Sequence, residues 1–397
     1  MSKLNNFQLI HSYHQSQARA GILTTSHGTV HTPVFLPVGS HGAVKTLTPE
    51  DLNGIDITML LANTYHLYLR PGISIIEKMG GLHHFMAWDG AILTDSGGYQ
   101  IFSLAPLCQI NDDGVIFRSH IDGSQHLITP ELAIQFQESM GSDIIMVLDE
   151  CPAHNDNLKK VMTAMLRTHQ WAERCQAAQK RGDQALYAIV QGGLHTELRQ
   201  QSAKHLTSLD FSGYAIGGLC LGEPKNKTLA IIEETVPLLP VDKPRYLMGI
   251  GSPEDIIKGI DMGVDIFDSA LPTRVARNGA FFTMHGRINI RNAYYKQVER
   301  SIDPHCHCYT CSTYSAAYLH HLFNCNELLA YRLATIHNLS FINKLMYEIR
   351  VAIINNTFSL FKDSFLASYK STNERVRLIQ KQKFLNSRSF RLNSNNH

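Results

Sequence analysis

RYLMGIGSPEDIIKGIDMGVDIFDSALPTR, residues 245–274, contains two apolar runs separated by a segment that carries the signals of a helix. Residues 252–255, SPED, place a capping serine, a proline and two acidic residues at a helix start, and Gly263 follows its last turn. Apolar runs that alternate with helices are typical of a parallel sheet covered on both faces. The stretch therefore predicts one strand–helix–strand unit of an α/β fold.

The same unit recurs along most of the chain. Eight β-like runs occupy residues 34–39, 57–63, 91–97, 144–150, 186–193, 214–222, 245–251 and 265–274. Helix signals separate most of them, as where Thr129-Pro130-Glu131 opens a segment that Gly141 closes. Eight units over about 250 residues predict an α/β fold of the (β/α)8 TIM-barrel type. A doubly wound open sheet is the alternative, but no GxGxxG follows the first run.

Polar residues and glycines gather at the ends of these runs. They are Asn63, Asp95, Asp149, Glu150, Gln191, Gly218, Gly249 and Asp268. Any one of them could simply mark the start of a loop. In a barrel, however, the carboxyl ends of all strands converge on one mouth, where such folds carry their active sites. Their accumulation predicts a site at that mouth.

Composition limits the class of protein. The 397 residues are 44% apolar, and 36 Lys and Arg against 34 Asp and Glu give a net charge of +2. A nucleic-acid partner would therefore have to be met by a local basic patch. The amino-terminal residues lack the apolar core of a signal peptide, and no run of eighteen apolar residues occurs. We expect a soluble, cytoplasmic protein that does not enter a membrane.

Four regions are predicted. Residues 1–30 should supply strands that close the barrel, and residues 31–290 the catalytic (β/α)8 barrel, interrupted at 103–129 by a hairpin that turns at Asp122-Gly123. Residues 291–366 should form an inserted zinc-binding subdomain and carboxyl-terminal helices. Residues 367–397 are basic and rich in Asn and Ser, and we expect them to be disordered.

The segment CHCYTC, residues 306–311, supplies three closely spaced cysteines. Tetrahedral zinc needs a fourth ligand. The candidates are His305, His307, His320, His321, Cys325 and His337. His337 is preferred because it lies in a helical segment that could return to the cysteine loop. Three thiolates neutralise the metal, so a closed site of this type is structural rather than catalytic.

Three aspartates carry the predicted chemistry. LTDSGGYQ, residues 93–100, ends a strand at Asp95 and follows it with glycines whose N–H groups could approach a ligand, although Asp95 could instead cap the next helix. Asp149 and Asp268 also follow apolar runs. Paired carboxylates can divide the roles of nucleophile and proton carrier in glycosyl transfer, and a carboxylate can also accept hydrogen bonds from the edge of a base. Residues 273–277, TRVAR, contain two arginines that suit phosphate contacts. The alternative is that they belong to a solvated basic loop.

These stretches resemble the bacterial tRNA-guanine transglycosylases, also called queuine tRNA-ribosyltransferases. The likeness runs in order from residue 7 to residue 360 through NTYHLYLRPG, TDSGGYQIFS, IVQGG, KPRYLMGIGSPEDI, FDSALPTRVARNG and CHCYTCSTYSAAYLHHLF. It implies a homodimeric barrel enzyme with one structural zinc per subunit. Its reaction would exchange guanine at wobble position 34 of tRNAs with GUN anticodons for 7-aminomethyl-7-deazaguanine, a step of queuosine biosynthesis.

The resemblance also implies roles for individual residues. Asp268 would be the nucleophile that forms a covalent enzyme–tRNA intermediate, and Asp95 the proton carrier. The base would be bound by Asp95, Ser96, Gly97, Gly98, Tyr99, Asp149, Gln191, Gly218 and Met248. The anticodon loop would be held by Gly249, Ile250, Gly251, Ser252, Pro253, Glu254, Asp255, Thr273, Arg274, Val275, Ala276 and Arg277. Cys306, Cys308, Cys311 and His337 would bind zinc.

Three positions depart from the family pattern. Leu221 stands where a valine is usual, Ser269 replaces the cysteine after the nucleophile, and the loop after Cys151 is shortened. A bulky Leu221 should favour the small aminomethyl base over queuine, whose cyclopentenediol needs room.

Two rival functions remain. A metal-dependent barrel hydrolase would need an open metal site at the mouth, and no HxH follows the first strand. A non-catalytic RNA-binding subunit of the same fold would have no need of both Asp95 and Asp268.

Overall fold

The computed structural model describes residues 6–104, 108–371 and 379, and its centre is a closed barrel of eight parallel strands. In order around the barrel these are β4 (Val34–Gly39), β5 (Met59–Ala62), β6 (Ala91–Thr94), β10 (Ile144–Met146), β11 (Ala185–Val190), β12 (Gly213–Ile216), β13 (Arg245–Leu247) and β14 (Ile266–Ser269). The barrel closes where β14 pairs with β4, from Ile266 beside Val34 to Ser269 beside Pro37. The predicted fold class is confirmed, and each predicted run overlaps one barrel strand, with β11 and β12 beginning one residue before their runs.

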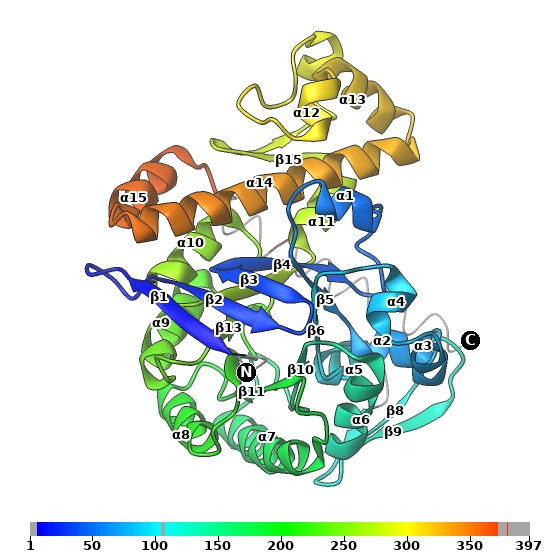
Figure 1. Cartoon of the computed structure of the whole chain (residues 1–397), viewed down its shortest axis with the longest axis vertical. Coiled ribbons are helices and arrows are strands. Elements are labelled where there is room, and N and C mark those ends of the chain that lie inside the picture. The colour runs from blue at the N-terminus through cyan, green and yellow to red at the C-terminus, as the bar shows by residue number, and fades with distance from the viewer. Residues whose placement is uncertain (1–5, 105–107, 372–378, 380–397) are drawn as a thin grey trace.

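Helices surround the barrel (Figure 1). They are α1 (Pro49–Asn53), α2 (Thr64–Leu69), α3 (Ile73–Lys78), α4 (Leu82–Met86), α5 (Gly98–Leu104), α6 (Pro130–Met140), α7 (Leu158–Ala178), α8 (Thr196–Thr207), α9 (Lys225–Thr235), the 3-10 turn η1 (Val236–Leu238), α10 (Pro253–Asp261) and α11 (Leu271–Arg277). Local chemistry fixes their ends. In α6 the Thr129 hydroxyl accepts a hydrogen bond from the Leu132 N–H at 3.3 Å, and Gly141 ends the helix at φ 71°.

The amino-terminal strands form a sheet of their own. β1 (Phe7–Ser12), β2 (Arg19–Thr25) and β3 (Gly28–Thr32) are antiparallel and cross one end of the barrel in Figure 1. Arg19 binds Asp265, which precedes β14, and His27 binds Asp143, which precedes β10. Both partners lie at the amino ends of barrel strands, so this sheet covers the floor of the barrel, opposite the mouth.

A second antiparallel sheet interrupts the alternation, as expected. It consists of β7 (Cys108–Ile110), β8 (Val115–Arg118) and β9 (Gln125–Ile128), and the last two form the hairpin predicted at Asp122-Gly123. Its buried side chains Val115, Phe117 and Ile128 join the main core.

The carboxyl-terminal region is built on one long helix. β15 (Ala280–Thr283) pairs with β16 (Gly286–Asn289), and η2 (Ala293–Gln297), α12 (Tyr309–Thr313), α13 (Ala316–Asn324), α14 (Leu328–Ile354) and α15 (Phe358–Ser368) follow. α14 runs between the barrel and the projecting subdomain in Figure 1. Its first turns belong to a separate small core that includes Phe281, Leu319 and Phe323, and its later turns belong to the barrel core. One helix thus joins two cores.

The end of the described chain is packed. The predicted boundary at residue 367 falls inside α15, and the ring of Tyr369 stacks on Phe365 with centroids 5.0 Å apart. Lys370 bridges to Gly286. The remainder of the predicted tail, apart from residue 379, lies outside the described residues.

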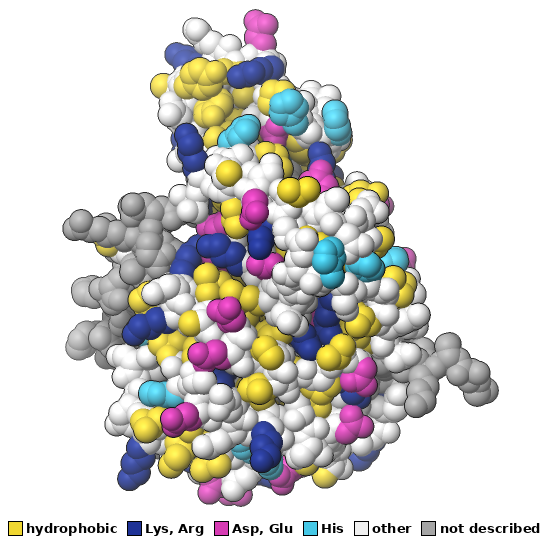
Figure 2. Space-filling model, turned by 90° about the vertical axis from the view of Figure 1, so that its left-hand side faces the viewer, with side chains coloured by type: hydrophobic (Ala, Val, Ile, Leu, Met, Phe, Trp, Pro, Cys, Tyr) yellow, Lys and Arg dark blue, Asp and Glu magenta, His cyan; other side chains and the backbone are white. Residues whose placement is uncertain are grey.

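In the described part of the chain no helix is long and apolar enough to span a membrane. On the face shown in Figure 2, acidic and basic side chains are interspersed rather than gathered into one patch of a single sign. This mixture agrees with the small net charge of +2.

Candidate active site at the barrel mouth

Asp95 lies directly after β6, with 7% of its surface exposed. Its carboxylate accepts hydrogen bonds from the Thr64 N–H at 2.9 Å, from Gln100 Nε2 at 2.7 Å and from the Asn63 amide. Burial raises the pKa of Asp95 to about 6, and the negative charge of Asp268 adds to this. Asp95 therefore does not act as a simple cap of α5, because its backbone donor, Thr64, begins α2 from the neighbouring strand.

Asp149 follows β10 and is 6% exposed. Gln191 Nε2 donates to it at 2.7 Å, and the Ser96 hydroxyl lies 3.5 Å from its other oxygen. Burial raises the pKa of Asp149 to about 6, with a further contribution from Asp95. Two carboxyl groups that titrate near neutrality and sense each other are typical of a reaction centre.

Asp268 is the third aspartate and lies within β14. Within the described chain, both of its hydrogen bonds fall on Oδ1, from the Tyr246 hydroxyl at 2.6 Å and the Gly249 N–H at 2.8 Å. Burial raises the pKa of Asp268, and these two bonds oppose the rise. They fix the orientation of the carboxylate and leave Oδ2 available for reaction.

Gln191, Gly218 and Met248 follow β11, β12 and β13, the strands between those that carry Asp149 and Asp268. Gln191 is fully buried, and its Oε1 has no hydrogen-bond partner among the described residues. Gly218 has φ +68°, and a Cβ there would lie 2.4 Å from that oxygen, so only glycine fits. A Cβ on Gly217 would lie 3.6 Å from the Met248 sulfur. The site thus combines an unpaired hydrogen-bond acceptor, Gln191 Oε1, with the apolar side chain of Met248.

The DSGGY loop covers Asp149. Gly97 adopts φ +83°, and a Cβ on Gly98 would lie 2.7 Å from the Asp149 carbonyl oxygen. Ser96 is buried, whereas Tyr99, in the first turn of α5, has 48% of its surface exposed. All the predicted base-contacting residues therefore follow the carboxyl ends of β6, β10, β11, β12 and β13, either in loops or, for Gly98 and Tyr99, in the first turn of α5.

The predicted RNA-contacting segments lie beside this mouth but differ in what they present. On α11, Thr273, Val275 and Ala276 are buried, while Arg274 is exposed and Arg277 partly exposed. Burial lowers the pKa of Arg277, and the charge of Arg274 lowers it further. On this helix, contact with an anionic ligand can come from the side chains of the two arginines.

In the segment 249–255 the acidic residues have a basic partner. Lys225 Nζ lies 2.9 Å from Glu254 and 2.7 Å from Asp255. Ile250, Gly251, Pro253 and Glu254 are buried, Ser252 and Asp255 are partly exposed, and Gly249 is exposed. Lys225 offsets the negative charge that this segment would otherwise bring to the mouth.

Cys306, Cys308, Cys311 and His337 come together, as predicted. Their ligand atoms all lie within 4.8 Å of one another, and His337 Nδ1 lies 3.3 Å from the Cys311 sulfur. His337 Nε2 is 2.8 Å from the Phe282 carbonyl oxygen, and an N–H there leaves Nδ1 free to bind a metal. Three sulfurs and one nitrogen fit a tetrahedral, closed metal site.

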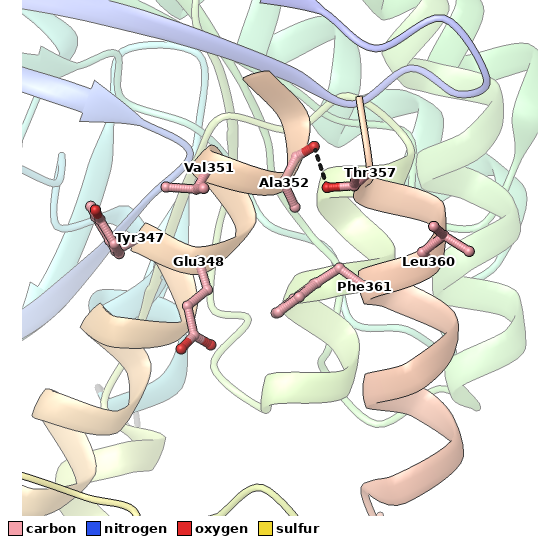
Figure 3. Close-up of a pocket in the computed structure, with 7 residues that line it drawn as sticks. All are labelled: Tyr347, Glu348, Val351, Ala352, Thr357, Leu360 and Phe361. Atoms are coloured by element: carbon pink, nitrogen blue, oxygen red, sulfur yellow. Dashed lines mark hydrogen bonds between the residues drawn. The ribbon is translucent and has the colours of Figure 1, made fainter. Parts of the chain in front are cut away.

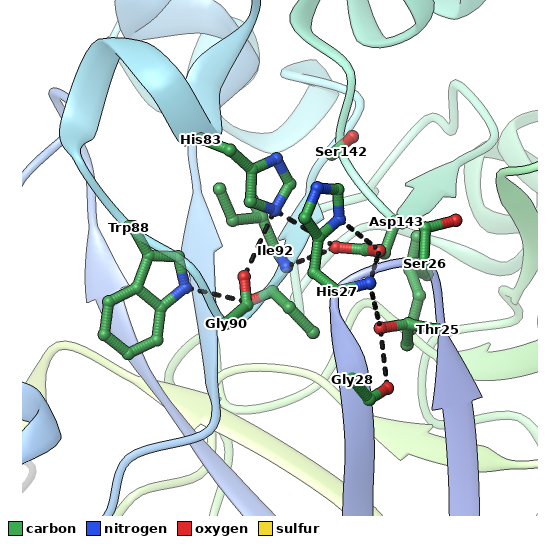
Figure 4. Close-up of polar contacts among 12 residues, drawn as sticks. Thr25, Ser26, His27, Gly28, His83, Trp88, Gly90, Ile92, Ser142 and Asp143 are labelled. Atoms are coloured by element: carbon green, nitrogen blue, oxygen red, sulfur yellow. Dashed lines mark hydrogen bonds and ion pairs between the residues drawn. The ribbon is translucent and has the colours of Figure 1, made fainter.

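A second group, His27, His83 and Asp143, does not suit a metal (Figure 4). The two imidazole rings are stacked with centroids 3.4 Å apart and planes 12° apart, so one ion cannot lie in the plane of both rings. Asp143 instead accepts from His27 Nδ1 at 2.8 Å and from the Ile92 N–H at 2.9 Å. The group connects the β2–β3 turn to the barrel floor.

A groove of about 470 Å³ lies between α14 and α15 (Figure 3). It is lined by Tyr347, Glu348, Val351, Ala352, Thr357, Leu360 and Phe361. Glu348 is its single carboxylate, so the groove does not repeat the cluster of acidic groups found at the mouth.

Two partners of the aspartates, Gln100 and Tyr246, were not predicted, and Asn63 was predicted only as one of the polar residues at the strand ends. Asn63 and Gln100 donate to Asp95, and Tyr246 donates to Asp268. Tyr246 lies two residues before Met248 on the same run, so strand alternation would place both side chains on the same side. That spacing is the signal that could have identified it.

Two of the residues that depart from the family pattern, Leu221 and Ser269, have defined hydrogen-bond partners in the structure. The Glu223 carboxylate accepts from the N–H groups of Cys220, Leu221 and Gly222, which holds Leu221 at the end of β12. The Ser269 hydroxyl accepts from the Leu271 N–H at 3.1 Å and supports the start of α11.

Comparison with known proteins identifies a family. The family model described as "Queuine tRNA-ribosyltransferase" matches residues 14–371. A protein of that name from Dehalococcoides mccartyi is 61% identical over 375 residues, covering 94% of this chain and 96% of the relative. One from Pelotomaculum thermopropionicum is 52% identical over 365 residues, covering 92% and 99%. One from Herpetosiphon aurantiacus is 50% identical over 384 residues, covering 97% and 98%.

Proposed function

The chain belongs to the queuine tRNA-ribosyltransferase family, and from that premise we propose that it is a tRNA-guanine transglycosylase acting in queuosine biosynthesis. It replaces the guanine at the wobble position of tRNAs with GUN anticodons by 7-aminomethyl-7-deazaguanine. The observation that carries the proposal is the presence of Asp95, Asp149 and Asp268 at one barrel mouth, where the charge of Asp268 helps to raise the pKa of Asp95 and the charge of Asp95 helps to raise the pKa of Asp149. The reaction takes place in the cytoplasm.

In the first displacement, Asp268 attacks ribose C1′ of the wobble nucleotide. The bond from C1′ to N9 of guanine breaks as the carboxylate oxygen bonds to C1′, and the protonated form of Asp95 gives its proton to the departing base. This leaves a covalent enzyme–tRNA ester, free guanine and an ionised Asp95. The bonds from Tyr246 and Gly249 to Oδ1 support this role because they favour the ionised carboxylate and hold it in one orientation.

In the second displacement, Asp95 removes the N9 proton of the incoming base. The nitrogen attacks C1′, the ester bond breaks, and Asp268 is released as a carboxylate. Two inversions give net retention of configuration, as in retaining glycosidases. A pKa of about 6 for Asp95 suits a group that must both take up and release a proton near neutrality.

The purine is held by the remaining residues of the site. Asp149 and Gln191 bind its polar edge, together with the backbone at Gly218, while Tyr99 and Met248 lie on either face of the ring. The unpaired Oε1 of Gln191 and the glycine contact beside it support a tightly fitted polar pocket. Ser96, Gly97 and Gly98 complete the contacts with the base.

The anticodon loop is held beside the site by residues 249–255 and 273–277. The exposed guanidinium of Arg274 and the partly exposed one of Arg277 bind phosphates next to the reacting nucleotide. Binding to tRNA should therefore weaken as salt concentration rises.

Zinc is the proposed occupant of the Cys306, Cys308, Cys311 and His337 group, with one ion per subunit. When bound, it supplies a cross-link between the cysteine loop and α14 and takes no part in the reaction. We further propose that two subunits form the active homodimer.

Leu221 should set the preference among incoming bases. The Leu221 N–H donates to the Glu223 carboxylate at 2.8 Å, which fixes the backbone that carries this side chain. The aminomethyl base should be used more efficiently than queuine. Tighter use of queuine in a tRNA exchange assay would overturn this preference.

Exchange of labelled guanine into guanine-bearing tRNA tests the function directly. The wild-type protein should incorporate label without added metal or nucleotide, and Asp95→Asn should reduce incorporation to background while the protein stays folded. Asp261→Asn, which changes a carboxylate bound to Lys362 at the end of α10, is the control and should retain full activity. Absence of incorporation by the wild-type protein would reject the proposal.

The two rival functions give different results in the same assay. A metal-dependent hydrolase would lose activity on mild chelation and would not exchange bases. A non-catalytic RNA-binding subunit would bind tRNA but incorporate no label.

A further inference from the structure

Arg199 is a fully buried arginine that reaches the mouth from α8. Its side chain is 1% exposed, and its guanidinium donates to three main-chain carbonyls: Gly193 at 3.0 Å, Val190 at 2.7 Å and Gly217 at 2.8 Å. The first two carbonyls flank Gln191 after β11, and the third precedes Gly218 after β12. One side chain therefore ties together the two loops assigned above to purine binding.

A second residue of α8 acts on the same loop. The Ser202 hydroxyl accepts from the Gln191 N–H at 3.2 Å and also contacts His169 Nε2 at 3.0 Å. Gln191 is thus held through its own N–H by Ser202, and through the carbonyls on either side by Arg199. Its amide reaches Asp149 at 2.7 Å from this fixed backbone.

A residue needed only to fill the core would not have to be an arginine. Burial lowers the pKa of Arg199 to about 10, which shows that the charged form is disfavoured there although the side chain remains protonated near neutrality. The three carbonyls offset this cost with hydrogen bonds. A planar guanidinium presents its donors in a fixed fork, whereas a lysine ammonium acts as a point charge and cannot hold three spread carbonyls in the same way.

The contacts around these loops leave no room for adjustment. A Cβ at Gly192 would lie 2.8 Å from the main-chain nitrogen of Arg199, and one at Gly218 would lie 2.4 Å from Gln191 Oε1. A small shift of the Gly217 carbonyl would therefore change the position of the Gln191 amide.

We propose that Arg199 is a positioning residue for base exchange, which fixes the two purine-binding loops through the carbonyls of Val190, Gly193 and Gly217. This inference rests on the proposed function. Arg199 would act on recognition of the base and not on the attack by Asp268 or on binding of the tRNA backbone.

The test compares Arg199→Lys with the wild type in guanine exchange, with free guanine and tRNA varied separately. We expect KM for free guanine to rise about tenfold, the loss expected when one well-placed buried hydrogen bond is broken, and KM for tRNA to change less than about twofold. If Arg199→Lys does not fold, Ser202→Ala decides the question, because it removes the acceptor for Gln191 and should also raise KM for guanine.

Arg245→Lys is the matched control. Arg245 is also buried and donates to a main-chain carbonyl, that of Leu239 at 3.0 Å, but it lies at the barrel floor at the start of β13. The Arg245→Lys substitution should lower the midpoint of thermal unfolding without changing KM for guanine. If the wild type is active and Arg199→Lys has the same KM for guanine, the inference is wrong but the proposed function stands. The same holds for Ser202→Ala if Arg199→Lys does not fold. A wild type that exchanges no guanine overturns the proposed function, and the inference with it.

Discussion

Tyr246 determines how the Asp268 carboxylate is oriented and charged. Replacing it with Phe removes the hydroxyl that lies 2.6 Å from Oδ1 and leaves the ring in place. Because a hydrogen bond to a charged group contributes about 1.5–3 kcal/mol, the rate of covalent adduct formation should fall by roughly one to two orders of magnitude. Single-turnover measurements with guanine-bearing tRNA would test this.

Tyr187→Phe provides the control for this substitution. Tyr187 lies on β11 and is fully buried, and its hydroxyl has no partner among the described residues. Loss of that hydroxyl should leave the adduct rate unchanged. Equal rates for Tyr246→Phe and the wild type would show that Tyr246 does not support the nucleophile.

Exchange should depend on pH through Asp95 and Asp149. Burial raises the pKa of each to about 6, so both are ionised only above that value. Since the proton carrier must be ionised to accept a proton from the incoming base, kcat/KM for guanine should fall as pH drops below about 6. The two groups interact, so the measured pKa values belong to the pair. A profile that is flat from pH 5 to pH 8 would contradict this assignment.

The aspartates could be predicted from the sequence because each follows an apolar run, and strand ends converge in a barrel. Asn63 ends a run in the same way, but which residues bind the aspartates could not be found from the runs. Tyr246 lies inside an apolar run and bonds to a residue 22 positions away, and Asn63 meets Asp95 across 32 positions. Such pairings depend on the register between neighbouring strands, which no local pattern contains.

Among the larger elements, α14 depends on the proposed zinc site for its attachment to the subdomain. Cys311→Ser should abolish stoichiometric zinc binding, measured by atomic emission, and should increase hydrogen exchange in α12 and α13 before the barrel strands. The reason is that the small core around Phe281, Leu319 and Phe323 is separate from the barrel core.

Cys325→Ser is the matched control for the metal site. Cys325 is exposed at the end of α13 and does not belong to the group of four ligands. This variant should retain one zinc ion per chain. Loss of zinc in Cys325→Ser, or its retention in Cys311→Ser, would contradict the ligand set.

Asp143 should make the floor of the barrel sensitive to acid. Burial raises the pKa of Asp143, but hydrogen bonds from His83 and His27 outweigh it, and the net pKa is lowered. A carboxyl group with a depressed folded pKa stabilises the protein above its unfolded value, about 3.9, and this contribution is lost as pH falls through the folded value. Urea unfolding at pH 7 and pH 3 would measure the loss.

Asp143→Asn should remove that acid sensitivity and lower the free energy of unfolding at pH 7. Loss of hydrogen bonds to a charged group typically costs about 1.5–3 kcal/mol. Asp363→Asn, which changes an exposed carboxylate on α15, should behave as the wild type. Identical pH dependence in Asp143→Asn and the wild type would show that Asp143 does not contribute in this way.

Local signals predicted the elements themselves well. Thr129 and Gly141 bound α6 as expected, and Asp122-Gly123 turns the β8–β9 hairpin. The sequence did not show how the first three strands attach, since that depends on Arg19 reaching Asp265 and His27 reaching Asp143 across 246 and 116 positions.

For the molecule as a whole, the number and order of the barrel strands followed from the repeated apolar runs. The placement of the subdomain could not be derived in that way. It depends on α14, whose first turns pack in the small core and whose later turns pack in the barrel core. The convergence of Cys306, Cys308, Cys311 and His337 then follows from that placement. The proposed metal ligands Cys308 and Cys311 belong to the small core, whereas the three aspartates lie at the ends of barrel strands.

The most direct test is to mix the protein with guanine-bearing tRNA and separate the products under denaturing conditions. The wild type and Asp261→Asn should each give an enzyme–tRNA adduct that survives denaturation and is discharged by free guanine, because the link is an ester to Asp268. Asp268→Asn should give none, although it still binds tRNA. An adduct of unchanged yield in Asp268→Asn would contradict the central claim that this carboxylate is the nucleophile.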